Sequence, residues 1–114
     1  MQRDPRVYIQ DALDAANSIK AFLNDVDEKA FVESELVQSA VYYQFAIIGE
    51  ALNNFSKVSP EQARTIINLK NWVSFWNVLT HAYHRVSAEL VYNYAEESLP
   101  VLEAAIKSLI AEET

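Results

Sequence analysis

The sequence predicts an all-α protein, built as an up-and-down helical bundle with a long second helix and a kinked C-terminal helix. Its 114 residues include one glycine and three prolines, and a β-sheet protein needs more of these turn-forming residues. The apolar residues recur at spacings of three and four, the period of an amphipathic helix. Because 51% of the residues are hydrophobic, the chain can form one core without disulfides or metals, and we expect a single domain over residues 1–114.

The charge and the missing residue types exclude several classes of function. The chain has no cysteine, which removes disulfides, thiolate metal sites and thiol nucleophiles. Its net charge of −7 argues against electrostatic binding of a nucleic-acid backbone over a large surface. Any RNA contact must therefore be local or made by an assembly. We find no run that resembles a signal peptide or a membrane span, and we expect a soluble, cytoplasmic protein.

The first expected helix begins with Asp4 as N-cap and Pro5 at the first helical position. It should fray over residues 24–27, where Asp27 can cap a short turn through Phe31. Its apolar stripe is formed by Tyr8, Ala12, Ala16, Ile19 and Leu23.

The second, long helix is expected over residues 34–55, SELVQSAVYYQFAIIGEALNNF. Its apolar positions cover more than one face, which indicates burial both in a core and against a partner. Gly49 costs about 1 kcal/mol relative to alanine in the middle of a helix, so we expect a close helix contact there. The two apolar rows are Leu36, Ala40, Tyr43 and Ile47, and beside them Val37, Val41, Ile48 and Phe55.

The remaining boundaries follow from capping and proline signals. Ser59, Pro60 and Gln62 fit a capping box with proline at the first helical position. Ser87 is the expected N-cap of the last helix, and Pro100, which lacks an N–H, should kink that helix.

Residues 71–86, NWVSFWNVLTHAYHRV, are expected to form a helix of their own and contain both histidines of the chain. Asn77, His81 and His84 fall on one side of the predicted helix, while Trp76 and Tyr83 fall on another, together with Val73 and Thr80. The stripe facing the core comprises Trp72, Phe75, Leu79, Ala82 and Val86.

Several chemistries fit this cluster poorly. His84 and Arg85 can simply complement the negative end of a helix dipole. Zinc needs three or four ligands and no HExxH pattern is present, so we expect no metal. No serine lies in a nucleophile elbow and there is no glycine-rich phosphate loop, so we expect neither a hydrolytic triad nor a bound cofactor.

Four segments, in this order, make the chain resemble the HepT-like branch of the HEPN superfamily. They are RDPRVYIQDAL, AIIGEALNNFS, the pattern W-x-x-F-x-N-V-L-T-H-A-Y, and SAELVYNYAEESLPVLEAAI. The branch carries the motif Arg-Asn-x-x-x-His-x-Tyr. Asn77, His81 and Tyr83 occupy its places here, but Trp76 stands at the place of the arginine.

The resemblance implies a HEPN-like dimer that acts as the RNase toxin of a type VII-like toxin–antitoxin system. It implies metal-independent cleavage of an RNA, such as a tRNA or an mRNA, in a cleft between the two protomers of a homodimer. His81 would move the proton, Asn77 would orient the imidazole or the phosphate, and the motif arginine would hold the developing charge. The partner implied is a minimal nucleotidyltransferase antitoxin that neutralises the toxin by AMP transfer to Tyr83, placing negative charge beside the site.

Trp76 changes this expectation for the present chain. An indole offers one N–H donor and no positive charge, so the chain should be an impaired nuclease. The arginine was either changed during cloning of a toxic gene or lost naturally, and the retention of His81, Asn77 and Tyr83 favours the first explanation. The alternative function is a non-catalytic helical module that binds a protein or nucleotide in the former cleft. Glu50 is either a buried acid that pairs with the catalytic helix or part of a solvated edge.

Overall fold

The chain folds as the helical bundle that its sequence predicts. A computed structural model describes residues 4–82 and 86–112, and these contain no strand. The elements are α1 (Pro5–Phe22), α2 (Glu28–Glu33), α3 (Glu35–Val58), α4 (Pro60–Ala63), α5 (Leu69–His81), α6 (Ala88–Asn93), the π-helical turn η2 (Tyr94–Ser98) and α7 (Leu99–Glu112). The predicted long helix is α3. None of the described helices is both long and apolar enough to cross a membrane.

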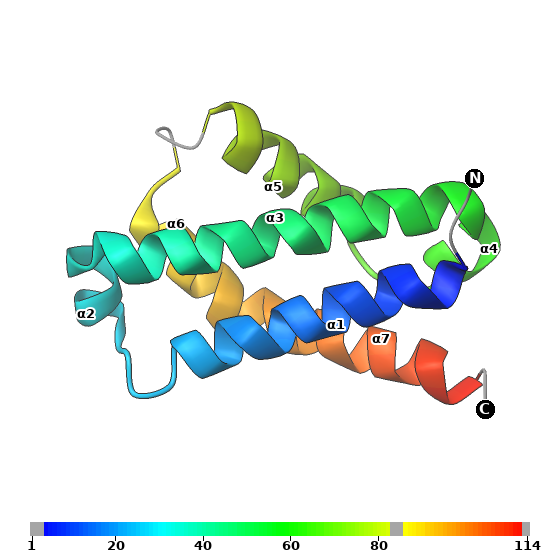
Figure 1. The fold of residues 1–114 in the computed structure, drawn as a ribbon, viewed down its shortest axis with the longest axis horizontal. Coiled ribbons are helices and arrows are strands. Elements are labelled where there is room, and N and C mark those ends of the chain that lie inside the picture. The colour runs from blue at the N-terminus through cyan, green and yellow to red at the C-terminus, as the bar shows by residue number, and fades with distance from the viewer. Residues whose placement is uncertain (1–3, 83–85, 113–114) are drawn as a thin grey trace.

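The two long helices α1 and α3 lie side by side and form the centre of the bundle (Figure 1). Helix α7 packs along α1, and α5 packs on α3. In the view of Figure 1, α5 lies above α3 and rises away from it at an angle, so its C-terminal end lies at the upper edge of the molecule. This arrangement places the segment with the candidate residues at the outside of the bundle.

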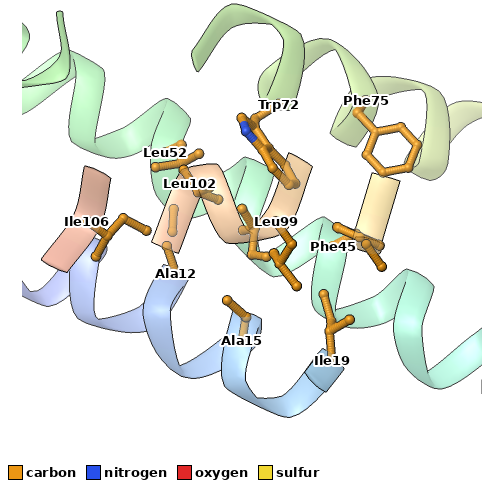
Figure 2. Close-up of a cluster of buried hydrophobic side chains, with 14 of the residues drawn as sticks. Ala12, Ala15, Ile19, Phe45, Leu52, Trp72, Phe75, Leu99, Leu102 and Ile106 are labelled. Carbon is orange, nitrogen blue, oxygen red and sulfur yellow. The ribbon is translucent and has the colours of Figure 1, made fainter. Parts of the chain in front are cut away.

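The core is built from side chains of α1, α3, α5 and α7, as Figure 2 shows. Small residues on α1, Ala12, Ala15 and Ala16, let the neighbouring helices approach closely, while Phe45 and Trp72 fill the space between α3 and α5. One predicted row of α3 is buried, with Val41, Ile48 and Phe55 fully inside. In the other row, Leu36 and Tyr43 are exposed, whereas Ala40 and Ile47 are half-buried.

The predicted N-caps of three helices are confirmed. The carboxylate of Asp4 accepts a hydrogen bond from the backbone N–H of Arg6 at 2.9 Å, and that of Asp27 accepts one from Ala30 at 2.8 Å. The hydroxyl of Ser87 accepts one from Leu90 at 3.1 Å. Side-chain and backbone hydrogen bonds from Arg6 lower the pKa of Asp4 from 3.8 to about 2. These contacts are local, which is why the sequence reveals them.

Two predictions about helix ends are wrong. The helix expected over residues 71–86 begins earlier, at Leu69, and ends at His81, so Ala82 and Val86 do not continue its stripe. The capping box at Ser59 does not form, because the hydroxyl of Ser59 donates to the side-chain oxygen of Gln62 at 2.7 Å instead of accepting from a backbone N–H. The N–H of Ser59 is already bonded to the carbonyl of Phe55, at the end of α3.

Pro100 is accommodated by a widening of the helix before it. The last helical run passes from α6 through the π-helical turn η2 into α7, and Pro100 is the second residue of α7. Proline lacks an N–H, and its ring crowds the carbonyl four residues earlier, that of Glu96, which lies within η2. A π-helical turn moves that carbonyl away, so the predicted irregularity at Pro100 takes this form.

A buried carboxylate joins α7 to α1. Glu103 is 6% exposed, and its Oε2 accepts a hydrogen bond from the ammonium of Lys20 at 3.1 Å. No local pattern in the sequence indicates this pair, since the two residues lie far apart in the chain.

Candidate active site

Helix α5 is held to the bundle by an aromatic cluster on one of its faces. Trp72, Phe75 and Leu79 are buried, which confirms this part of the predicted stripe. The rings of Phe45 and Trp72 have centroids 5.8 Å apart, and those of Phe75 and Tyr94 stack at 4.5 Å. The burial raises the pKa of Tyr94. These contacts fix the rotation of α5 about its own axis, so the face opposite the buried stripe is turned to solvent.

His81 is the last residue of α5, and its ring is held through one nitrogen. Nδ1 lies 3.1 Å from the carbonyl oxygen of Asn77 and 3.0 Å from Oγ1 of Thr80. A carbonyl only accepts hydrogen bonds, so Nδ1 carries the proton in this contact. The neutral ring then has its lone pair on Nε2. Because His81 is exposed, this nitrogen is the one available as a base for a substrate.

Asn77 and Thr80 contribute to this arrangement in ways the sequence analysis did not foresee. The main-chain carbonyl of Asn77, rather than its side-chain amide, contacts the ring of His81. The hydroxyl of Thr80 donates to the carbonyl of Trp76 at 3.0 Å, with a second contact to the carbonyl of Asn77 at 3.3 Å. The side chain of Asn77 is exposed near His81 and can take part in binding.

Trp76 packs against α3 at its single glycine. A Cβ added to Gly49 would lie 2.1 Å from Cβ and 2.8 Å from Cγ of Trp76, and 3.2 Å from the carbonyl oxygen of Trp72. The expectation of a close helix contact at Gly49 is therefore confirmed. Only glycine lets the two backbones come this near. Trp76 is half-buried, and the atoms that fill the contact are its first two side-chain carbons.

Replacing Gly49 by alanine should destabilise the protein. The added methyl group meets Cβ of Trp76, which cannot move without displacing α5, and such overpacking typically costs about 1–3 kcal/mol. This exceeds the about 1 kcal/mol that alanine gains in helix propensity. Urea unfolding should show the loss, with Ser39→Ala, at an exposed position of the same helix, as the neutral control. A Gly49→Ala protein as stable as the parent would contradict the close contact.

Position 76 and His81 do not share a side of α5. They are five residues apart, which is about 140° around a helix. Within one protomer, their side chains therefore leave the helix in different directions. The helical spacing predicts that the two residues lie on different sides, and the described helix retains that relation.

The remaining candidate residues are Glu50 on α3, possible metal ligands, and the three residues after Ala82. Glu50 is exposed, so it is part of a solvated edge of α3, and the reading as a buried acid is wrong. Among residues 4–82 and 86–112, no group of three or more histidines and acids is placed to hold a metal ion. Tyr83, His84 and Arg85 lie outside the described residues.

Comparison with known proteins gives consistent results. Residues 12–109 match the family model described as ribonuclease HepT-like. The chain is 26% identical over 110 residues to the protein named "Putative RNase MJ1380" of Methanocaldococcus jannaschii, covering 93% of this chain and 96% of that protein. It is also 26% identical over 113 residues to the "Probable ribonuclease HepT" of Thermococcus cleftensis, covering 96% of this chain and 98% of that protein. No solved structure matches significantly.

Proposed function

Because the chain belongs to the HepT-like ribonuclease family, we propose that it is a metal-independent endoribonuclease whose catalytic base is His81. The observation that carries this proposal is the state of the His81 ring. Its Nδ1 is bonded to a main-chain carbonyl, while its Nε2 is available at an exposed helix end. A base must lie within hydrogen-bond reach of the proton it takes, and Nε2 of an exposed side chain meets that need in the tautomer that donates from Nδ1.

The proposed reaction uses the RNA's own 2′-hydroxyl as nucleophile. His81 Nε2 takes the proton of the 2′-hydroxyl, and the 2′-oxygen attacks the adjacent phosphorus. The bond from phosphorus to the 5′-oxygen of the next nucleotide breaks, and that oxygen leaves and takes up a proton. The products are a 2′,3′-cyclic phosphate and a free 5′-hydroxyl. Negative charge gathers on the phosphate oxygens in the transition state, so a cation nearby lowers the barrier.

Trp76 leaves this chain without that cation at the motif position. A guanidinium gives a charged, bidentate fork to a phosphate, whereas an indole gives one neutral donor. We therefore expect the chain as it stands to bind RNA but to cleave it poorly. Incubating the Trp76→Arg protein with RNA in the presence of a chelator is the direct test: cleavage supports the proposal, and intact RNA contradicts it.

The directions of the two motif positions support a site shared by two protomers. Since the side chains at 76 and 81 diverge by about 140°, one phosphate is reached more simply by position 76 of one protomer and His81 of its partner. Helix α3, on which Trp76 packs, also carries the predicted row that begins at Leu36 and is only partly buried. In that row Leu36 is 82% exposed and Tyr43 is 66% exposed. We propose this row as the homodimer surface.

Placing a charge in this row should separate the dimer. Tyr43→Glu would bring an unpaired carboxylate into an apolar interface, which is costly without a partner. Sedimentation velocity should then show monomers where the parent shows dimers. Leu90→Glu is the matched control, because Leu90 is 53% exposed on α6 and lies outside the row. A parent protein that sediments as a monomer would contradict the shared site.

We further propose that the protein is the toxin of a toxin–antitoxin pair and is controlled by a minimal nucleotidyltransferase. This proposal rests on the resemblance of the motif Asn77, His81 and Tyr83 to the HepT-like pattern. AMP transferred to the hydroxyl of Tyr83 would add negative charge two residues from His81 and repel an RNA phosphate. Intact-mass measurement after incubation with a minimal nucleotidyltransferase and ATP should show a gain of adenylyl mass that is lost in Tyr83→Phe.

Trp76 also favours a second candidate function, a non-catalytic module that binds a partner in the same cleft. A large aromatic side chain adds buried area to an interface, and binding a partner in this way requires no positive charge at position 76. This candidate predicts complex formation that is insensitive to His81→Ala and no RNA cleavage by the Trp76→Arg protein.

A further inference from the structure

Helix α5 carries an exposed polar row that begins far from His81. Lys70, Ser74, Asn77 and His81 lie at spacings of four, three and four residues, which places them on one side of a helix. All four residues are exposed. The row lies opposite the buried stripe of Trp72, Phe75 and Leu79, so it follows the solvent face of α5 from its first turn to its last residue.

A hollow lies at the end of this row. It has a volume of about 580 Å³ and is formed where α4, the following turn and the start of α5 meet. Its apolar lining comes from Pro60, Ala63, Ile66 and Leu69, and the cations beside them are Arg64 and Lys70. Pockets for small organic groups typically have volumes of about 300–1,000 Å³, so one nucleotide fits this space.

The charge around the hollow differs from that of the whole protein. Residues 51–82 contain three cations, Lys57, Arg64 and Lys70, against one acid, Glu61, although the chain has a net charge of −7. The pair between Arg64 and Glu61 has atoms 3.7 Å apart, and both side chains are largely exposed. Such a surface pair holds its partners weakly, so Arg64 can turn to another anion. The residues that line the hollow include the cations Arg64 and Lys70 and no acid, so the lining is basic on an acidic molecule. Glu97 lies in the adjoining pocket, beside Asn68 and Asn71.

We infer that this hollow is a binding subsite for a nucleotide that flanks the cleavage site in a single-stranded RNA. This inference rests on the proposed function of His81. With the reacting phosphate at His81, the strand follows the polar row of α5. A base farther along the strand enters the apolar hollow, and the phosphates on its two sides meet Lys70 and Arg64. The eleven helical steps from Lys70 to His81 span about 16 Å, the length of about five stacked nucleotides. The subsite therefore selects RNA with an unpaired stretch of at least that length.

Binding of RNA by the chain as it stands tests this inference, because Trp76 impairs cleavage and leaves binding measurable. The probe is a fluorescein-labelled, 2′-O-methylated single strand of about twelve nucleotides, followed by anisotropy over a series of salt concentrations. Arg64→Ala/Lys70→Ala should weaken binding about tenfold at low salt and lower the salt slope by about 1.4, the contribution of two phosphate contacts on a single strand. The matched control is Lys29→Ala/Lys107→Ala, which removes the same charge from α2 and α7.

A shorter probe separates the subsite from a general charge effect. A strand of about four nucleotides cannot occupy His81 and the hollow together, so the parent protein should bind the long probe more tightly than the short one. Arg64→Ala/Lys70→Ala should remove most of that difference, and the control should keep it. Equal affinity and equal salt slope for the long probe would overturn the subsite. An equal loss of RNA affinity in the control variant would also overturn the subsite.

The outcomes also distinguish this inference from the function on which it rests. If the Trp76→Arg protein cleaves RNA and the Arg64 and Lys70 substitutions leave RNA binding unchanged, only the subsite is wrong. If the Trp76→Arg protein leaves RNA intact while the two substitutions weaken RNA binding and the control does not, the ribonuclease proposal is wrong and the basic hollow remains a site for RNA.

Discussion

Trp76→Arg is expected to raise the rate of RNA cleavage about 10²- to 10³-fold. One preorganised donor at a charge that develops in the transition state typically has an effect of this size, and a guanidinium adds a full positive charge. The substitution should also be tolerated by the fold. Cβ and Cγ, the atoms of Trp76 that lie closest to Gly49, have counterparts in an arginine side chain, and the longer part of arginine can extend into solvent.

The measurement is the initial rate of cleavage of a labelled RNA by purified protein with a chelator present. Trp76→Gln is the matched control, because glutamine has a similar stem and hydrogen-bond donors but no charge. The account predicts a clear gain for arginine and little or none for glutamine. Equal gains for both variants would show that removal of the indole, rather than the cation, matters. A Trp76→Arg protein that is folded and inert would contradict the role given to position 76.

His81→Ala in the Trp76→Arg background is expected to lower the rate about 10²- to 10⁴-fold, the usual contribution of a positioned acid or base. The substitution removes the nitrogen that takes the proton of the 2′-hydroxyl. It should leave the fold intact, since His81 is exposed at the end of α5. The same cleavage assay measures the loss, and circular dichroism checks the helix content.

Asn77→Ala provides the informative comparison for His81. The contact to Nδ1 of His81 is made by the main-chain carbonyl of Asn77, which alanine retains. The tautomer of the ring should therefore survive, and the loss in rate should be smaller than for His81→Ala. A loss as large as that of His81→Ala would assign an essential role to the amide of Asn77 instead. A His81→Ala protein that cleaves at the parent's rate would remove His81 from the mechanism.

Local signals in the sequence predicted much of the fold. The caps at Asp4, Asp27 and Ser87 could be identified because a capping side chain bonds a backbone group two or three residues away. The buried face of α5 followed from the spacing of Trp72, Phe75 and Leu79, since the period of an amphipathic helix is itself a local property.

The ends of α5 could not be predicted in the same way. Apolar residues continue at helical spacing to Val86, but periodicity does not mark where a helix stops, and no glycine follows His81 as a stop signal. The N-cap of α5, Asn68, has a φ of 64°, a left-handed conformation that asparagine tolerates better than most residues. That asparagine was the available signal for a start at Leu69, and it was missed.

The candidate site contains one contact that is local in the sequence and one that joins two helices. The contact between Nδ1 of His81 and the carbonyl four residues earlier is local, so it could have been anticipated from the position of His81 on a helix. The partner of Gly49 could not, because the contact with Trp76 joins two helices whose crossing is set by the whole core. The basic hollow likewise depends on the way in which the turn after α4 brings Arg64 beside Lys70.

The chemical ends left by the Trp76→Arg protein test the central claim most directly. Attack by the RNA's own 2′-hydroxyl, assisted by Nε2 of His81, must leave a 2′,3′-cyclic phosphate on one fragment and a 5′-hydroxyl on the other, without any metal. Mass spectrometry of fragments produced in the presence of a chelator should find these ends, and a fully 2′-O-methylated strand should remain uncut. Fragments with 3′-hydroxyl and 5′-phosphate ends, or cleavage of the methylated strand, would contradict the mechanism proposed for His81.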